Sequence, residues 1–426
     1  MLKNKKILVY GLGLTGRELV KFLLDKGAVV YIYDDKNFLK LNNTIWLSQE
    51  DISKINFAVI SPGVEQTKMV QALKIYKVPI YSELKFASMF VKGKIIAVTG
   101  TNGKTTTVTL LSEIFKKANI NHCLCGNVGK PLISCLDKNY DYYICEISSF
   151  QLEYLGEFKP YISALLNIAP DHLSRHKDME SYEKIKFSIF DNVKNAAIIN
   201  NNLKNNKLTK NIKKELITFS AYENADVHRQ ENFITYNDIS LNLDFVKLKG
   251  NKNIENIMVC VAISKLCKIP NESIIKGVYN FCGLPHRIQF VLNNEGVDYI
   301  NDSKATNPDS TCSALECFKN VILLLGGFDK GLSYLEIFKF GNIKKIVLFG
   351  KAKNVIFESA KSVGFDNVVL ADDLYSAVKM AKGVAVAGDT VLLSPACSSY
   401  DAYKNYEERG EDFKNICFQI SGRGNE

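Results

Sequence analysis

Short apolar runs alternate with amphipathic stretches along almost the whole chain of 426 residues. A short apolar run bounded by turn residues is typical of a buried strand, and apolar residues at helical spacing are typical of a helix that packs on a sheet. Regular alternation of the two predicts an α/β fold with mainly parallel sheets. The predicted strands cover residues 7–10, 29–33, 57–60, 95–98, 142–145, 162–166, 321–325, 346–349 and 391–393.

These strands fall into three blocks, which we expect to be three domains. The blocks cover residues 1–90, 91–283 and 284–426. A chain of this length is too long for one ordinary hydrophobic core, and the length alone suggests about three domains.

Composition narrows the class of protein further. No stretch approaches the roughly 20 apolar residues of a membrane span, and the lysine-rich start leads into a strand, so we expect a cytoplasmic protein without membrane insertion. Eleven cysteines without Cys-x-x-Cys pairs indicate reduced core thiols rather than disulfides or zinc; Cys123 and Cys125 are close, but their spacing is not that of a metal site. The net charge of +9 could suggest nucleic acid, but the lysines are spread along the chain and a basic face would also suit small phosphorylated, acidic substrates, so net charge cannot choose between these partners. We expect no nucleic-acid partner.

The most informative motif follows the predicted strand 95–98. Gly100 and Gly103 permit a tight turn, and Lys104 begins a helix whose N-terminal amides can face an anion. Lys104 would then contact the phosphates of a nucleotide, and the Thr105 hydroxyl would contact Mg²⁺. The first glycine of the full P-loop pattern is missing, so an ordinary strand-to-helix turn remains an alternative.

A second glycine-rich turn lies near the N-terminus. Residues Gly11–Gly16 follow a strand and precede a helix, and the next strand ends at Asp34, where a ribose-binding acid is expected. This order of strand, turn, helix, strand and acid predicts phosphate or ribose binding. Two alternatives give the same pattern: the glycines only permit a tight turn with close helix packing, and Asp34 only ends a strand. The turn 61–63, which contains Gly63, follows the strand 57–60 toward the same edge of the sheet.

Polar residues also follow strands in the second block. Glu146 ends the strand 142–145, and an acid at this edge commonly reaches nucleotide-bound Mg²⁺. Asn127 lies in the turn 126–129 and is either a ligand donor or a turn residue. His172 follows the strand 162–166, and we expect it near Glu146 as a magnesium or phosphate contact, with a surface histidine as the alternative.

Lys186 lies in a helical stretch over residues 182–190. Apolar residues surround it in the sequence, and periodicity alone predicts a lysine that faces solvent.

Several segments, in one order along the whole chain, resemble the Mur ligase family. The segments are GTNGKTT at 100–106, EISSFQLE at 146–153, NIAPDH at 167–172, LPHR at 284–287, NDSKATN at 301–307 and LSPACSS at 393–399. The N-terminal fingerprint, with residues 302–307 and 399–410, is most similar to the D-glutamate-adding branch of that family. The resemblance implies an N-terminal Rossmann-like domain, a central P-loop ATPase domain and a C-terminal Rossmann-like domain.

The resemblance also implies an activity and its partners. A monomeric cytoplasmic ligase would add D-glutamate to UDP-N-acetylmuramoyl-L-alanine through an acyl phosphate, with ATP as co-substrate and two Mg²⁺ ions, in peptidoglycan synthesis. Catalysis would involve Lys104, His172, Lys186 and Arg287.

The resemblance assigns binding roles residue by residue. The UDP-linked substrate would be bound by Leu14, Thr15, Asp34, Gly63, Asn127 and His172. ATP would be bound by Gly100, Asn102, Gly103, Lys104, Thr105, Thr106, Asn256, Arg287, Asp302 and Lys304. Mg²⁺ would be held by Thr105, Glu146, His172 and, once carbamylated, Lys186. D-glutamate would be bound by Thr306, Lys330, Ser399 and Tyr406, where the family often has Phe in place of Tyr406.

Two other functions fit part of the pattern. A nicotinamide-dependent oxidoreductase would use the turn at residues 11–16, but it leaves Lys104 and Glu146 unexplained. A non-enzymatic nucleotide-binding regulator would use the P-loop without any turnover. Nicotinamide binding distinguishes the first alternative, and turnover distinguishes the second.

Overall fold

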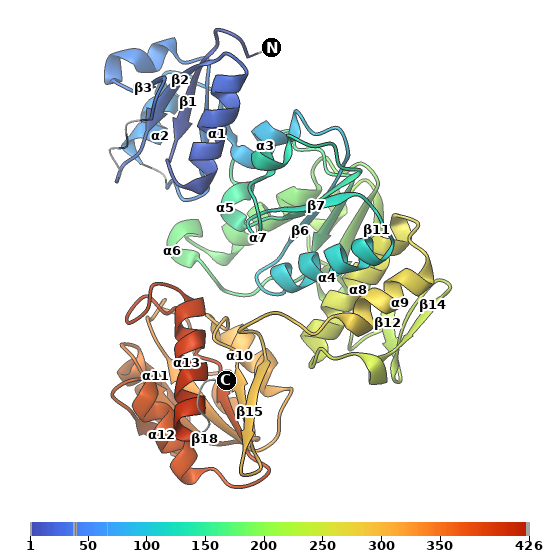
Figure 1. Cartoon of the computed structure of the whole chain (residues 1–426), viewed down its shortest axis with the longest axis vertical. Helices are drawn as coiled ribbons and strands as arrows, with labels where there is room; N and C mark the ends of the chain where they lie inside the picture. Colours follow the sequence, from blue (N-terminus) through green and yellow to red (C-terminus); the bar gives the residue numbers. More distant parts are fainter. Residues whose placement is uncertain (1, 37–38, 40, 66, 423–426) are drawn as a thin grey trace. The chain divides into compact units, whose positions relative to one another are not determined.

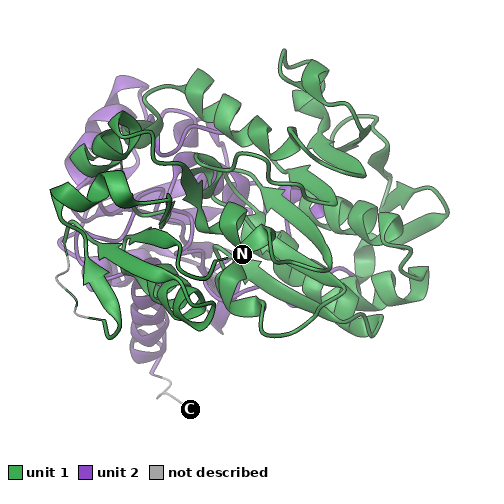
Figure 2. Ribbon diagram, turned by 90° about the horizontal axis from the view of Figure 1, so that it is seen from above, with its two compact units in different colours: residues 1–168, 173–245, 255–280 green, residues 169–172, 246–254, 281–426 purple. Residues whose placement is uncertain are grey.

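Parallel strands joined by helices build most of the molecule, which is coloured along the sequence in Figure 1. The computed structural model describes residues 2–36, 39, 41–65 and 67–422. Two compact units are formed: residues 1–168, 173–245 and 255–280 make the first, and residues 169–172, 246–254 and 281–426 make the second (Figure 2). Two sheets lie in the first unit and one in the second, and each falls within one of the three predicted blocks. The exact domain boundaries remain a prediction.

The first sheet has five parallel strands in the order β3-β2-β1-β4-β5. The chain leaves β1 on one side toward β2 and later returns to its other side as β4. A ligand crevice is expected at the carboxyl ends of two strands where the order reverses in this way. The strands are β1 (Lys6–Tyr10), β2 (Val29–Tyr33), β3 (Thr44–Trp46), β4 (Phe57–Ile60) and β5 (Ile80–Ser82). The helices are α1 (Leu14–Asp25), η1 (Gln49–Lys54), α2 (Lys68–Ile75) and α3 (Glu83–Ser88).

The second sheet has nine strands in the order β14-β13-β12-β11-β10-β9-β6-β8-β7. All neighbours are parallel except in the β12-β13-β14 meander. The strands are β6 (Lys94–Thr99), β7 (His122–Gly126), β8 (Tyr142–Glu146), β9 (Ile162–Leu165), β10 (Ala196–Asn200), β11 (Glu215–Ser220), β12 (Val227–Gln230), β13 (Phe233–Tyr236) and β14 (Ile239–Asn242). Because β6 lies between β8 and β9, the P-loop after β6 is flanked by the ends of both neighbours.

The segments around this sheet are helical. The α-helices are α4 (Lys104–Lys117), α5 (Ser149–Leu152), α6 (Leu173–His176), α7 (Met179–Phe187), α8 (Asn251–Leu266) and α9 (Asn271–Asn280). Short 3-10 helices are η2 (Leu132–Cys135), η3 (Ser188–Phe190), η4 (Asn201–Leu203), η5 (Thr209–Asn211) and η6 (Leu243–Phe245). Helix α4 packs on β7 and β8 on one side and on α9 on another, which fixes the direction in which its N-terminus points.

The third sheet, in the second unit, has the order β15-β16-β20-β17-β18-β19. Only the edge pair β15 and β16 is antiparallel. The strands are β15 (Gln289–Asn294), β16 (Val297–Asn301), β17 (Val321–Gly326), β18 (Ile343–Phe349), β19 (Val368–Leu370) and β20 (Thr390–Leu393). The helices are α10 (Pro308–Leu315), η7 (Ile337–Lys339), α11 (Lys353–Ser362), α12 (Leu374–Val384) and α13 (Tyr406–Ile420).

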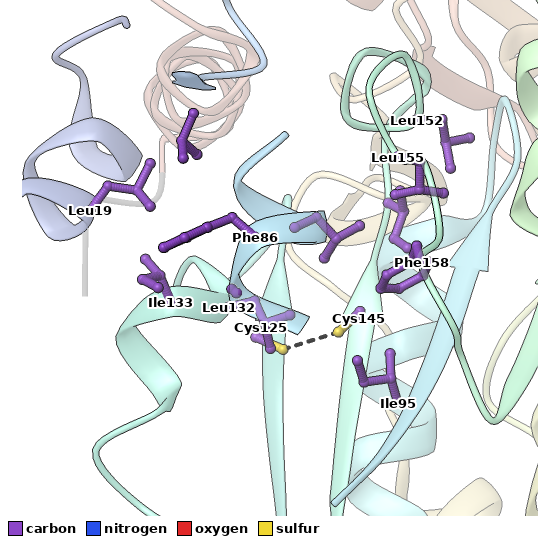
Figure 3. Packing of buried hydrophobic residues seen from close by; sticks show 14 of the residues in the cluster. Leu19, Phe86, Ile95, Cys125, Leu132, Ile133, Cys145, Leu152, Leu155 and Phe158 are labelled. Carbon is purple, nitrogen blue, oxygen red and sulfur yellow. Dashed lines mark hydrogen bonds between the residues drawn. The ribbon is translucent and has the colours of Figure 1, made fainter. Parts of the chain in front are cut away.

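A continuous hydrophobic cluster contains side chains of both sheets of the first unit. Leu19 of α1, Phe86 of α3 and Ile133 of η2 are buried in it together with side chains of both sheets (Figure 3). Full burial of a side chain of this size contributes roughly 1.5–3 kcal/mol. Within the described ranges, no helix combines the length and the apolar character needed to cross a bilayer.

Each strand predicted from the apolar runs is found, and the mainly parallel pairing is confirmed. Several strands that the pattern did not predict are short, as in β3 and β5 with three residues each, or lie at a sheet edge, as in β7 and β15. A strand of this kind buries few side chains, so its apolar run is short or interrupted.

Candidate functional site

The loop between β6 and α4 forms a tight turn at the carboxyl edge of the second sheet. Gly103 caps α4 with a φ of +85°, a conformation that favours glycine. A Cβ atom at this position would lie 2.3 Å from Oδ1 of Asn256. The Asn256 side chain, which is buried in α8, also accepts a hydrogen bond from Thr107 Oγ1 at 3.2 Å. Glycine is therefore required where the loop meets Asn256, a predicted ATP contact.

The side chain of Lys104 folds over this loop. Its Nζ donates to the carbonyl oxygens of Gly100 and Thr101, both at 2.8 Å. Thr105 and Thr106 follow in the first turn of α4, where the backbone amides form the positive end of the helix dipole. The loop thus combines an ammonium group, hydroxyls and helix N-terminal amides, which are the groups that bind polyphosphates.

Asn167 braces the loop from the end of β9, a role that the sequence did not reveal. Its side chain accepts from the backbone amide of Asn102 at 2.9 Å and donates to the carbonyl of Asn102 at 3.1 Å. The Thr101 hydroxyl lies 3.1 Å from the hydroxyl of Tyr182 in α7. The only sequence signal for Asn167 is its place in the segment 167–172.

Lys186 is buried, with 1% of its surface exposed, so the periodicity-based prediction of a solvent-facing lysine is wrong. Its Nζ donates to Thr99 Oγ1 at 3.0 Å and to the carbonyl of Gly100 at 2.8 Å. The long side chain reaches from α7 to the end of β6, a contact that helical periodicity cannot predict. Lys104 and Lys186 consequently share one acceptor, the Gly100 carbonyl oxygen.

Glu146 ends β8 in register with Val98 of β6, at the same edge as the P-loop. It is 2% exposed, and its Oε1 accepts from Asn127 Nδ2 at 2.8 Å. Among the described residues, none donates a hydrogen bond to the buried Oε2. Burying a carboxylate oxygen without a partner is unfavourable, and a carboxylate oxygen is a preferred Mg²⁺ ligand. The residues present therefore fit a magnesium ion, with Asn127 orienting the carboxylate.

A hollow of about 610 Å³ opens at the carboxyl edge of the first sheet. All four predicted residues of this block, Leu14, Thr15, Asp34 and Gly63, line it. The Asp34 carboxylate is held in place, because it accepts from the amides of Leu12 at 2.7 Å and Lys36 at 2.9 Å. The hollow lies where β1 and β4 meet, at the point where the strand order reverses.

The glycines of the N-terminal turn are explained by close packing. A Cβ atom at Gly16 would lie 1.9 Å from the carbonyl oxygen of Gly11, and one at Gly11 would lie 2.9 Å from the Cβ atom of Ser61. The tight-turn interpretation of these residues is thus confirmed. It does not exclude ligand binding, since close packing of turn and strand also shapes the hollow.

In the second unit, Arg287 lines another hollow, of about 450 Å³, together with Lys247, Lys249 and Asn253. Asp302, in the same unit, is buried. Its carboxylate accepts hydrogen bonds from Ser394 Oγ at 2.8 Å and from the amide of Ile288 at 3.2 Å. Burial outweighs these bonds and raises the pKa of Asp302 to about 7.

Lys304 and Tyr406, predicted for ATP and D-glutamate respectively, lie in direct contact. The Lys304 Nζ is 3.9 Å from the centre of the Tyr406 ring, the geometry of a cation–π interaction. Ser399, also a predicted D-glutamate contact, is 3% exposed. It does not cap α13, because Asn405 does so by accepting from the amide of Glu408 at 2.7 Å.

Asp171 organises a second polar cluster in this unit. Its carboxylate accepts from Lys330 Nζ at 3.2 Å and from Asn307 Nδ2 at 3.3 Å, and it lies 3.6 Å from His172 Nε2. Burial opposes the charged form, but the charges of Lys330 and His172 together with the hydrogen bonds from Lys330 and Asn307 outweigh it and lower the pKa of Asp171. Thr306 precedes Asn307 in the chain. The predicted proximity of His172 to Glu146 remains a prediction, because the two residues belong to different units.

Arg409 of α13 is a buried residue that the sequence analysis missed. Its guanidinium donates to the carbonyl of Ser303 at 2.8 Å and to the carbonyl of Cys397 at 3.1 Å. It therefore ties together the two loops that carry Lys304 and Ser399. A single arginine in an acidic helix gives no sequence signal for this role.

Two family models match the chain. The Mur ligase middle domain matches residues 98–264, and the Mur ligase glutamate ligase domain matches residues 286–397. The chain belongs to the Mur ligase family, as its sequence and its P-loop α/β fold agree in showing.

Relatives within the family carry a more specific name. The UDP-N-acetylmuramoylalanine–D-glutamate ligase of Alkaliphilus metalliredigens is 38% identical over 97% of this chain and 98% of its own length. The enzyme of the same name from Clostridioides difficile is also 38% identical, over 97% of this chain and 98% of its own.

Solved structures show the same fold at lower sequence identity. The MurF ligase of Thermotoga maritima in complex with ADP has a TM-score of 0.64 and 15% identity, covering 98% of this chain and 96% of that one. A pseudomurein peptide ligase type C from Methanothermus fervidus has a TM-score of 0.63 and 18% identity, covering 98% of this chain and all of that one.

Proposed function

We propose that this protein is an ATP-dependent ligase that joins D-glutamate to UDP-N-acetylmuramoyl-L-alanine. The observation that carries the proposal is the arrangement at the end of β6 and β8: two lysines share the Gly100 carbonyl, and Glu146 has a buried oxygen without a hydrogen-bond partner among the described residues. Full-length similarity to ligases of this name supports the choice of substrates.

Different groups of predicted site residues would bind the different substrates. The hollow at the first sheet, with Leu14, Thr15, Asp34 and Gly63, would accept the uridine nucleotide. In the second unit, Lys330, Thr306, Ser399 and Tyr406 would bind D-glutamate, and the cations Arg287 and Lys304 would contact ATP together with Asp302. Asn127 and His172 would contact the muramoyl part of the substrate.

The chemistry must join a carboxylate to an amine. The substrate carboxylate attacks the γ-phosphorus of ATP, ADP leaves, and an acyl phosphate forms. The D-glutamate amine then attacks the acyl carbon, and phosphate leaves from the tetrahedral intermediate as the amine loses a proton. The first step brings two anions together, the substrate carboxylate and the ATP phosphates. Lys104 and Arg287 would offset the repulsion between these anions and so stabilise the transition state, an effect often worth about 3 kcal/mol per well-placed group. His172 can accept this proton only while its ring is not bound to a metal ion, and we favour its role as a magnesium ligand.

Thr105 and Glu146 would hold a magnesium ion, with Asn127 fixing the orientation of the carboxylate. When bound, Mg²⁺ neutralises charge on the phosphate oxygens. We further propose a second magnesium ion, held by His172 and by Lys186 after carbamylation, which would convert the buried ammonium into an anionic ligand. The protein would act as a monomer in the cytoplasm.

One assay tests the proposal. Phosphate release is measured with the purified chain, ATP, Mg²⁺ and UDP-N-acetylmuramoyl-L-alanine, while D-glutamate, L-glutamate, L-lysine and meso-diaminopimelate are supplied in turn. We expect turnover with D-glutamate alone, and no nicotinamide binding in a parallel fluorescence titration. Turnover with a different amino acid, or ATP binding without turnover for any of them, would overturn the assignment.

A further inference from the structure

Four cysteines gather on one face of the second sheet. Cys123 and Cys125 are two residues apart in β7, so their side chains point to the same face. Cys145 of β8 is the in-register neighbour of Cys125, and Cys135 ends η2. Figure 3 shows the sulfur atoms of Cys125 and Cys145 facing each other beside Leu132. All four are free thiols.

Three of these sulfur atoms converge on a common point. The Sγ atoms of Cys123, Cys125 and Cys135 all lie within 4.8 Å of one another, and those of Cys123 and Cys135 are 3.0 Å apart. In a tetrahedral thiolate site with metal–sulfur bonds of about 2.3 Å, neighbouring sulfurs are about 3.8 Å apart. The Cys123–Cys135 separation is shorter than this spacing and no separation exceeds it by more than about 1 Å, so small side-chain shifts would bring all three sulfurs to bonding distance of one metal ion.

The surroundings of the cluster also suit a metal ion. Cys125 and Cys135 are buried at 0% and 2% exposure, while Cys123 is partly exposed and gives access from the surface. The buried neighbours Leu132 and Tyr143 keep bulk water away.

We propose that Cys123, Cys125 and Cys135 bind one thiophilic metal ion of the Zn²⁺ and Cu⁺ class. The Cys145 sulfur lies 3.3 Å from that of Cys125, but it is not one of the three sulfurs that all lie within 4.8 Å of one another, so it is not part of the proposed ligand set. Soft thiolates select these ions over Mg²⁺, so the site is chemically distinct from the oxygen ligands proposed at Glu146. The proposal does not depend on the ligase activity.

Metal binding can be tested on the reduced, metal-stripped full-length protein. Cd²⁺ serves as a spectroscopic substitute for Zn²⁺, because its bonds to thiolate produce a charge-transfer absorption in the ultraviolet. With excess Mg²⁺ present to occupy oxygen sites, we expect the absorption to rise to an end point at one Cd²⁺ per chain and to disappear as Zn²⁺ is added. Native mass spectrometry of the wild-type protein should show one bound Zn²⁺.

Variants locate the site. Cys123→Ser and Cys135→Ser should each weaken Cd²⁺ binding by at least about tenfold, because each removes one thiolate ligand. Cys317→Ser, which removes a partly exposed thiol outside the cluster, should bind like wild type. Circular dichroism checks that each variant is folded. If Cys135→Ser does not fold, the Cd²⁺ affinity of Cys123→Ser and the native mass spectrum of the wild-type protein still test the proposal. No end point at one equivalent, unchanged binding by Cys123→Ser, or closure of a Cys123–Cys135 disulfide in reducing buffer would overturn the proposal.

Discussion

Lys104 and Lys186 approach the Gly100 carbonyl from different elements, and each donates to it at 2.8 Å. Two positive charges that share one acceptor repel each other, and the repulsion is stronger here than in water because Lys186 is buried. An anion bound between the two side chains relieves this repulsion. The local electrostatics of the P-loop therefore favour a polyphosphate, or a lysine that has become an anion by carbamylation.

Replacement of Lys186 separates its catalytic role from a structural one. Lys186→Met keeps the side-chain volume and removes a buried charge, so the melting temperature without ligands should stay the same or rise. Phosphate release should fall at least about 100-fold, because a charged group at the phosphate site is lost. Lys184→Met, on an exposed position of the same helix, is the control and should leave both measurements unchanged. A variant with wild-type turnover would contradict the proposed role.

Glu146 gives a prediction about the metal. Glu146→Gln retains an oxygen that can accept from Asn127, but it removes the negative charge that a magnesium ligand needs. The Mg²⁺ concentration for half-maximal phosphate release should rise by roughly tenfold or more. The exposed Glu157→Gln should not change it, and an unchanged Mg²⁺ dependence of Glu146→Gln would remove this residue from the metal site.

At the scale of elements, Glu83 links α3 to η2. It is the first residue of α3, it is 2% exposed, and its Oε1 accepts from the amide of Ile133 at 2.7 Å. Burial outweighs this bond and raises the pKa of Glu83 to about 7. The ionised form of Glu83 therefore opposes the packing of α3 on η2, and the protonated form favours it.

This arrangement predicts how stability depends on pH. Between the ordinary glutamate pKa near 4.5 and the raised value near 7, the folded protein holds a proton that the unfolded chain has lost, so the contribution of Glu83 to stability falls as pH rises. Glu83→Gln lacks this dependence and keeps the acceptor for Ile133. It should be more stable than wild type at pH 8, by roughly 3 kcal/mol, and the difference should shrink toward pH 5.

Denaturant unfolding at several pH values measures this difference. The exposed Glu180→Gln is the control and should follow the wild-type curve. A stability gain of Glu83→Gln that is equal at pH 5 and pH 8 would show that the carboxyl does not titrate as expected.

At the scale of the whole molecule, the proposed ATP contacts are shared between the two units. Lys104 and Asn256 belong to the first unit, and Arg287, Asp302 and Lys304 belong to the second. An acyl phosphate is also hydrolysed by water, so closure around the substrates would protect it.

We therefore expect the radius of gyration from small-angle X-ray scattering to decrease when ATP analogue, Mg²⁺ and UDP-linked substrate are all present. Each ligand alone should have a smaller effect, because fewer contacts join the units. A radius that stays unchanged at saturation would contradict closure.

The sequence alone determined the α/β class, the mainly parallel sheets and the two glycine-rich turns. Apolar runs such as 95–98 and 321–325 are buried on both faces, so their composition reports their structure directly. Gly103 and Gly16 are likewise required by local backbone geometry and close packing. These features depend on neighbours in the chain or on one packing contact, and a pattern of residue types is enough to indicate them.

Only the tertiary structure decided which polar side chains meet. Lys186 reaches Gly100 across 86 positions, Asn167 braces Asn102 across 65, and Arg409 binds Ser303 across 106. Cys135 joins Cys123 although their spacing matches no common metal motif. Periodicity describes which face of an element a residue occupies, whereas the reach of a long side chain and the partner it finds depend on how distant elements pack.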